Sequence, residues 1–158
     1  MNTMIRDILE RVPLFQGLAM EELDLLARLF LRESFAAGSV VFEQGDPADR
    51  LYVLVSGQVQ IQYRPYDGGV LTVAEILEGG VFGWSSVLGR KAYSSFALAV
   101  ADSHALSIEG QTLRRLCMDH PQTGVLVMER LTGVIAERLR STHEQVARLL
   151  WQGVNRPN

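Results

Sequence analysis

The segment from Phe82 to Ala99 carries the residues that are best suited to hold an anion. A glycine at the start of a short helix leaves backbone N–H groups without intrahelical partners, and the positive end of the helix dipole attracts a phosphate to them. Serine hydroxyls in and after this helix can donate further hydrogen bonds. In this segment the candidate residues for such contacts are Gly83, Trp84, Ser85, Ser86, Ser94 and Ser95.

Residues for catalysis or metal binding are sparse in this sequence. His104, His120 and His143 are far apart in the chain, and none has a second metal ligand at the usual spacing. Cys117 is the single cysteine, which rules out an intrachain disulfide and favours a buried thiol with no chemical role. The chain has neither a nucleophile elbow nor a P-loop. We therefore expect no enzyme, no metal site and no cofactor.

The length and composition indicate one folded domain over residues 1–158. Hydrophobic residues make up 47% of the chain and charged residues 21%, which is ordinary for a globular protein. The net charge of −3 gives no general attraction to nucleic acid or to an anionic membrane. Charged residues interrupt every apolar stretch of the N-terminus, MNTMIRDILERVPLF, so we expect no signal peptide and no membrane span. These features predict a cytoplasmic protein that does not act at a membrane.

The hydrophobic pattern changes twice along the chain. Over residues 1–34 apolar side chains recur every three or four positions, which predicts N-terminal helices. Over residues 35–109 short β-branched and aromatic runs alternate with glycines, which predicts a β-roll of the jelly-roll type. These runs are VVF at 40–42, LYVLV at 51–55, QVQIQY at 58–63, VLTVAEIL at 70–77 and FALAVA at 96–101. Residues 111–151 return to a helical pattern, so the predicted fold class is mainly β with flanking helices, a double-stranded β-helix.

The last predicted helix, from about Gln122 to Leu150, has a stripe of apolar or neutral side chains at an average spacing near 3.5 residues. Such a stripe forms the seam between two paired helices. Packing of the helix on its own domain explains the first half of the stripe equally well, whereas charged residues flank the second half as they do in a helix pair. We therefore predict a homodimer through a seam made of Met128, Leu131, Ile135, Leu139, Thr142, Val146 and Leu149.

The run from Phe35 to Gly83 resembles the cyclic-nucleotide-binding domain family, to which the catabolite activator protein and the regulatory subunit of protein kinase A belong. The matching stretches are FAAGSVVFEQGDPADRLYVLVSGQVQIQ at 35–62 and LEGGVFG at 77–83. The helical segments before and after them resemble the family's N-terminal helical bundle and its C-terminal dimer helix. The resemblance implies a regulatory sensor domain that binds a nucleotide and catalyses no reaction.

In this family a phosphate-binding cassette holds the ligand, and the resemblance places it at residues 80–97. The cassette here resembles a bacterial variant and departs from the usual pattern at two positions. Trp84 replaces the acidic residue that holds the ribose hydroxyl, and Tyr93 replaces the arginine that pairs with the cyclic phosphate. Loss of that charged donor costs roughly 2–4 kcal/mol. A cyclic nucleotide, cAMP or cGMP, is therefore expected to bind weakly or in an altered way.

Other cassette residues leave alternatives open. Arg90 and Lys91 either turn inward to replace the missing arginine or lie on a solvated loop tip. Trp84 either stacks on a base or sugar or plugs the pocket. The resemblance therefore implies an anion-binding cradle made of Gly83, Trp84, Ser85, Ser86, Ser94 and Ser95, and a ligand site that adds Tyr93 and Arg90 to it.

The leading hypothesis is a regulatory sensor that binds a small anionic ligand and signals through its C-terminal helix. One alternative is a ligand-free dimerisation or interaction scaffold. Another is the sensor half of a transcription regulator of the catabolite-activator type, which needs a helix-turn-helix domain of roughly 60 residues. Only WQGVNRPN follows Leu150, so we expect no direct binding to nucleic acid. The sequence does not identify a downstream protein partner.

Overall fold

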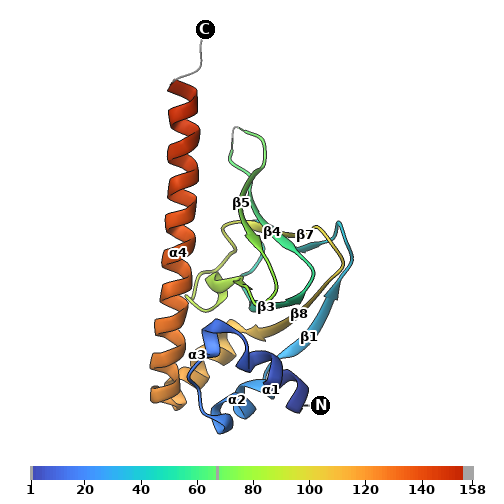
Figure 1. Ribbon diagram of the computed structural model, residues 1–158, viewed down its shortest axis with the longest axis vertical. Coiled ribbons are helices and arrows are strands. Elements are labelled where there is room, and N and C mark those ends of the chain that lie inside the picture. Colours follow the sequence, from blue (N-terminus) through green and yellow to red (C-terminus); the bar gives the residue numbers. More distant parts are fainter. Residues whose placement is uncertain (1, 67, 155–158) are drawn as a thin grey trace.

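The N-terminal helices lie at one end of a β-roll, and a long helix runs along the side of the roll (Figure 1). The computed structural model describes residues 2–66 and 68–154, and of Asn2, Leu149, Gly153 and Val154 it describes the backbone alone. Within these residues the chain forms four α-helices, two short 3-10 helices and eight strands.

The predicted N-terminal helices are present, but they end before residue 34. Helix α1 spans Asn2–Glu10, the 3-10 helix η1 spans Pro13–Phe15, and α2 spans Met20–Ala27. Strand β1 then occupies Leu31–Phe35, so residues 31–34 belong to the roll. This strand pairs antiparallel with β8, Ser103–Glu109, from Leu31 opposite Ser107 to Phe35 opposite Ser103. Here pairing with a distant strand overrides the local helical pattern.

Two sheets of antiparallel strands face each other and form the roll. The remaining strands are β2 Val40–Phe42, β3 Arg50–Ser56, β4 Val59–Tyr63, β5 Leu71–Ile76, β6 Val81–Phe82 and β7 Phe96–Ala99. The first sheet has the order β1-β8-β3-β6, and the second has the order β2-β7-β4-β5. All five runs that were predicted as strands form strands, and the jelly-roll-like β-roll with flanking helices is confirmed.

Strand β3 is buried on both faces because it separates two hydrophobic cores. Leu51 and Val53 face the helices and join a core that contains residues of α1, α2, α3 and α4. Tyr52 and Leu54 face the interior of the roll and join the second core. Because successive side chains of a strand point to opposite faces, this one strand holds the helical layer against the roll.

Two helices follow the last strand, as predicted. Helix α3 spans Gly110–Asp119, and α4 spans Pro121–Val154. Pro121 is the first residue of α4, a position where its missing N–H costs no helical hydrogen bond. No helix within the described residues, α4 included, has an apolar stretch that would cross a membrane.

The first half of α4 packs on its own domain. Leu131 is 1% exposed and lies in the core between the helices and β3. Met128 and Ile135 are partly buried against the same core. The dimer seam predicted at these three residues is therefore corrected, because the N-terminal helices and α3 already cover this face of α4 within one chain.

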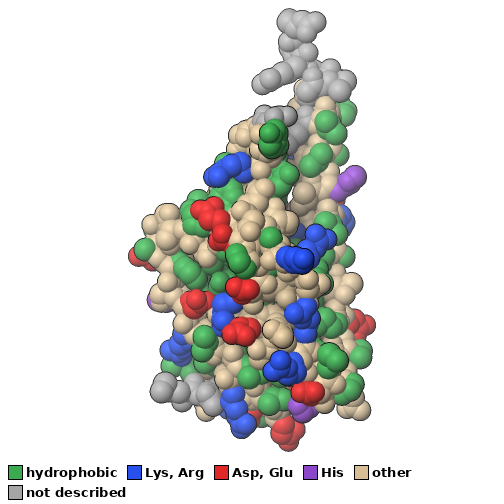
Figure 2. Space-filling model, turned by 180° about the vertical axis from the view of Figure 1, so that it is seen from behind, with side chains coloured by type: hydrophobic (Ala, Val, Ile, Leu, Met, Phe, Trp, Pro, Cys, Tyr) green, Lys and Arg blue, Asp and Glu red, His purple; other side chains and the backbone are tan. Residues whose placement is uncertain are grey.

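The second half of α4 leaves apolar side chains exposed. Leu139 is 64% exposed, and Val146 is exposed as well. Figure 2 shows hydrophobic side chains along the upper part of this helix. Thr142 is partly buried, and its hydroxyl donates to the carbonyl of Arg138 at 2.9 Å. The side chain of Leu149 lies outside the described residues. This half of α4 is open to a partner helix, and so is Val125 near the start of the helix, which is 67% exposed.

Shortening Leu131 tests whether the first half of α4 is anchored in the core. We expect Leu131→Ala to lower the free energy of unfolding by about 3 kcal/mol, because it leaves a cavity in a closed core. Leu77→Ala is the matched control, since Leu77 is exposed after β5, and it should change stability by less than about 0.5 kcal/mol. Urea unfolding followed by circular dichroism at one protein concentration measures both. Equal effects would contradict the packing described for α4.

Candidate functional site

The predicted cradle begins at a turn that requires glycine. Gly83 follows β6 and has a φ of 80°, in the left-handed region. A Cβ atom at this position would lie 2.8 Å from the carbonyl oxygen of Arg50 and 3.1 Å from the ring of Tyr52. Any larger residue would therefore collide with β3. The turn leads the chain into the 3-10 helix η2, Trp84–Ser86.

The first two amides after this turn are open to an anion. The amide of Ser86 donates to the carbonyl of Gly83 at 3.3 Å, and the amide of Val87 donates to the carbonyl of Trp84 at 2.9 Å. By contrast, the amides of Trp84 and Ser85 donate to no acceptor within the part of the chain that the structure describes. Adjacent turn amides of this kind can bind the oxygens of a phosphate.

Three serine hydroxyls line one small cavity beside these amides. Ser85 is buried, Ser95 is partly buried and Ser94 is exposed. None of the three hydroxyls has a hydrogen-bond partner among the described residues, so each is available to a ligand. The cavity measures about 60 Å³, and its lining is Phe42, Ile61, Phe82, Gly83, Trp84, Ser85, Tyr93, Ser94, Ser95 and Arg138.

Ser86 and Arg90 were predicted as ligand contacts, but neither lines this cavity. The hydroxyl of Ser86 donates to the carbonyl of Gly83 at 2.8 Å, so the turn itself uses it. Arg90 lies with Lys91 at a separate hollow on the other side of η2. The prediction is corrected for both residues, and neither Arg90 nor Lys91 takes the place of the missing cassette arginine in this cavity.

Tyr93 forms part of the cavity wall, but its hydroxyl bonds to the protein. The ring is 6% exposed and stacks on Phe42, with ring centroids 3.7 Å apart. Its hydroxyl donates to the carbonyl of Arg50 at 2.6 Å and accepts from the amide of Arg50 at 3.0 Å. Burial raises the pKa of Tyr93, so the phenol stays neutral. The hydroxyl thus fixes the cassette to β3, and the role of Tyr93 as a ligand contact stays a prediction.

Aromatic side chains fill the roll behind the cavity. The rings of Tyr52 and Phe82 stack with centroids 5.0 Å apart, and Phe42 lies 5.9 Å from Tyr52. The remaining 60 Å³ equals about two water molecules at roughly 30 Å³ each. Pockets for drug-sized ligands usually measure about 300–1,000 Å³. In this conformation the cavity is too small for a nucleotide.

Arg138 of α4 brings a positive charge to the cavity. Its guanidinium lies 4.5 Å from the centre of the Trp84 ring and donates to the carbonyl of Val81 at 3.2 Å. Burial lowers the pKa of Arg138 to about 10, so the side chain remains charged at neutral pH. It is the one cation among the described residues that line the cavity. Arg138 therefore offers a forked, charged donor to a bound anion and joins the cavity to α4.

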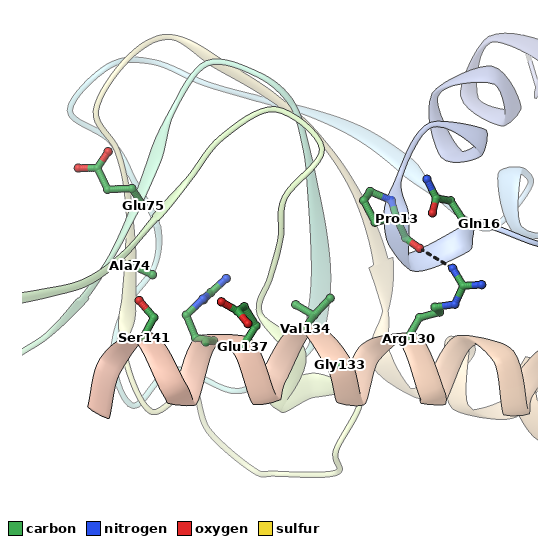
Figure 3. Close-up of a pocket in the computed structure, with 10 residues that line it drawn as sticks. Pro13, Gln16, Ala74, Glu75, Arg130, Gly133, Val134, Glu137 and Ser141 are labelled. Carbon is green, nitrogen blue, oxygen red and sulfur yellow. Dashed lines mark hydrogen bonds between the residues drawn. The ribbon is translucent and has the colours of Figure 1, made fainter. Parts of the chain in front are cut away.

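Arg138 also borders a larger groove between α4 and the roll (Figure 3). The groove measures about 550 Å³ and is lined by residues of α4, β5 and η1. Figure 3 shows Val134, Glu137 and Ser141 projecting from α4 toward the roll, and Arg130 donating to the carbonyl of Pro13, at 3.4 Å. Because Arg138 lines both spaces, its side chain lies between the small cavity and the groove.

The sequence analysis gave Arg138 no role at the ligand site. In the sequence, Arg138 is one of the charged residues that flank the second half of the predicted dimer seam. One signal was present: Arg138 follows Ile135 by three residues, so the two lie on the same face of a helix. Once Ile135 packs on its own domain, Arg138 must face the roll as well.

The residues considered for metal or thiol chemistry do not line the cavity. In the described ranges, no group of three or more His, Cys, Asp or Glu side chains is placed to hold a metal ion. Burial raises the pKa of the Cys117 thiol, which favours its protonated form. His104 lies on β8, where its Nδ1 is 3.0 Å from the hydroxyl of Ser34.

Known proteins share both the sequence and the fold of this chain. The profile of the family described as the cyclic nucleotide-binding domain matches residues 32–120. A CRP-like cAMP-activated global transcriptional regulator of Mycobacterium tuberculosis is 31% identical over 148 residues, which cover 94% of this chain and 64% of that protein. The cyclic AMP receptor protein of Thermus thermophilus is 35% identical over 128 residues, which cover 81% of this chain and 57% of that protein. The chain thus spans less than two thirds of the length of these relatives.

A solved structure extends the match to nearly a whole protein. The crystal structure of a putative cyclic nucleotide-binding protein from Geobacter metallireducens has a TM-score of 0.75 and 28% sequence identity to this chain. The similarity covers 85% of this chain and 97% of that one. With the profile match over more than half of the sequence, these similarities show that the chain belongs to the cyclic nucleotide-binding domain family.

Proposed function

We propose that this chain is a non-enzymatic regulatory sensor that binds a cyclic nucleotide, cAMP or cGMP, at the cassette and signals through α4. The observation that carries the proposal is that three kinds of donor meet at one cavity. They are the unpaired amides of Trp84 and Ser85, the free serine hydroxyls and the guanidinium of Arg138. All three favour the oxygens of a phosphate group.

A nucleotide enters this site only when the side chain of Arg138 moves. The cavity of about 60 Å³ then joins the adjoining groove of about 550 Å³, which is large enough for a base and a ribose. The guanidinium exchanges its contacts with Trp84 and Val81 for the cyclic phosphate. Because Arg138 belongs to α4, this exchange changes the contacts that position the helix, and ligand binding shifts its conformation.

The names of the relatives support this class of ligand. The regulator of M. tuberculosis is described as cAMP-activated, and the protein of T. thermophilus is described as a cyclic AMP receptor. The match to the family profile, which covers residues 32–120, includes the cassette at residues 80–97.

The affinity for cAMP is reduced by the two replaced cassette residues. The hydroxyl of Tyr93 is engaged with Arg50 and carries no charge. Trp84 has no acceptor for a ribose hydroxyl, and Arg138 covers one face of its ring. Loss of the cassette arginine costs roughly 2–4 kcal/mol, or about one and a half to three decades of affinity. Arg138 compensates for part of this loss.

A line of exposed side chains along α4 supports a homodimer through that helix. Val125, Leu139 and Val146 are exposed, and with Thr132 they recur every seven residues along α4. A seven-residue repeat places these side chains along one seam of a helix pair. The proposed seam therefore keeps Leu139 and Val146 from the sequence prediction and loses the residues that are buried in the domain.

A ligand-free scaffold is the second candidate function, and the closed cavity favours it. Aromatic rings and Arg138 occupy the space that a cyclic nucleotide would need. In this case the roll serves to present α4 to a partner. The two candidates differ in one property, because only the sensor changes its stability or shape when a cyclic nucleotide is added.

The remaining predictions from the sequence stay predictions. They are one domain over residues 1–158, a cytoplasmic location, no membrane association and no specific binding of this chain to DNA. The net charge of −3 supports the last of these. A mobility-shift selection on random duplexes measures it, and recovery of a defined site would reject it.

Calorimetry with cAMP, cGMP and inorganic phosphate tests the proposed ligand. We expect the chain to bind at least one cyclic nucleotide with a dissociation constant above about 1 μM. Arg138→Gln should weaken this binding by about 10- to 100-fold, because it removes a charged donor. Arg140→Gln is the matched control, since Arg140 is exposed on α4 and pairs with Glu137. Equal binding by both variants would contradict the role of Arg138, and no binding by the unmodified chain would favour the scaffold.

Sedimentation equilibrium tests the proposed dimer. We expect the unmodified chain to be dimeric and Leu139→Asp with Val146→Asp to be monomeric, because two carboxylates cannot be buried in an apolar seam. Met118→Asp is the control, since Met118 is an exposed apolar residue of α3, and this variant should remain dimeric. A monomeric unmodified chain would contradict the proposed seam.

A further inference from the structure

A second hollow lies across η2 from the cassette cavity. It measures about 460 Å³, more than seven times the volume of that cavity. Ser85 lines the small cavity, whereas its neighbour Ser86 lines this hollow. The lining consists of Ala48, Asp49, Arg50, Ser86, Gly89, Arg90, Lys91, Glu109, Gln111 and Arg114.

Backbone hydrogen bonds fix the walls of this hollow. The amide of Ala48 donates to the carbonyl of Lys91 at 3.1 Å, and the amide of Gly110 donates to the carbonyl of Asp49 at 2.9 Å. The amide of Arg90 donates to the carbonyl of Ser85 at 3.1 Å. Three segments that are distant in the sequence are thus tied together, and the shape of the hollow is set before any ligand binds.

The hollow is strongly basic. Four cationic side chains line it, against the two carboxylates of Asp49 and Glu109. Arg50 is already engaged, since it donates to the hydroxyl of Ser107 at 2.9 Å and lies 3.8 Å from a carboxylate oxygen of Glu109.

The other three cations of the hollow are Arg90, Lys91 and Arg114. Within the described residues, they take part in no side-chain hydrogen bond and no salt bridge. The mutual repulsion of these unpaired charges is relieved when an anion lies between them.

We propose that this hollow is a second ligand site, distinct from the cassette, that binds a small anion with two linked phosphate groups, such as a diphosphate. Once Arg50 is set against Glu109, the three unpaired cations and the carboxylate of Asp49 leave an excess of two positive charges, which the oxygens of linked phosphates can neutralise. The guanidinium groups of Arg90 and Arg114 suit bidentate contacts to phosphate oxygens, and Lys91 adds a point charge. The volume admits a diphosphate and leaves room for an attached group.

Calorimetry with sodium pyrophosphate at low ionic strength tests this site in the full chain. We expect one pyrophosphate to bind per chain, with higher affinity than orthophosphate. Lys91→Gln and Arg114→Gln should each weaken pyrophosphate binding by about 10- to 100-fold, since each removes one charged donor. Arg115→Gln is the control on α3, because Arg115 is exposed and does not line the hollow.

Further variants distinguish binding at this hollow from binding at the cassette. Arg138→Gln should leave pyrophosphate binding unchanged, because Arg138 does not line the hollow. Loss of binding in that variant would place the anion in the cassette and overturn the proposal. Equal losses with Arg115→Gln and Arg114→Gln would show attraction to the overall surface charge and overturn it too. The proposal would also be overturned if the unmodified chain, shown to be folded by circular dichroism, did not bind pyrophosphate.

Discussion

The guanidinium of Arg138 joins the cassette to the long helix. It lies over the Trp84 ring and bonds to the carbonyl of Val81, so one side chain of α4 contacts the first residue of β6 and the first residue of η2. Burial strengthens these contacts because little water competes for the charge. An anion at the amides of Trp84 and Ser85 attracts the same guanidinium. The proposed function therefore requires that occupancy of the cavity and the position of α4 be coupled, and any such coupling is reciprocal.

The packing of α4 determines which part of the molecule can move when Arg138 is displaced. Leu131 is locked into the core of the helical layer, whereas Leu139 is exposed beyond the contact of Arg138. The start of α4 is thus anchored in the core of the domain, whereas the described part of the helix beyond Arg138 does not pack into that core. Tyr93 keeps the opposite wall rigid, since its hydroxyl makes two hydrogen bonds to the backbone of Arg50. A ligand that displaces Arg138 therefore acts on the helix rather than on the roll.

Local chemistry was predictable from the sequence, and contacts across the fold were not. Gly83 and Ser85 could be predicted as site residues because the glycine of the turn and the serine hydroxyl are only two positions apart in the chain. Strand β8 lies within the predicted roll over residues 35–109 but was not identified as a separate run, because Ser103 and Ser107, both buried, interrupt its apolar pattern. The engagement of the Tyr93 hydroxyl and the approach of Arg138 to Val81 depend on residues 43 and 57 positions away. Such pairings follow from the packing of strands and helices, which no local pattern specifies.

The fluorescence of Trp84 reports directly on the coupling between anion and helix. The sequence has two tryptophans, so Trp151→Phe leaves Trp84 as the single emitter. When a cyclic nucleotide draws the guanidinium of Arg138 away from this ring, the emission should change and saturate with the binding isotherm. The change should be absent when Arg138→Gln is added. Calorimetric binding of the nucleotide with unchanged Trp84 emission would contradict the coupling of this cavity to α4.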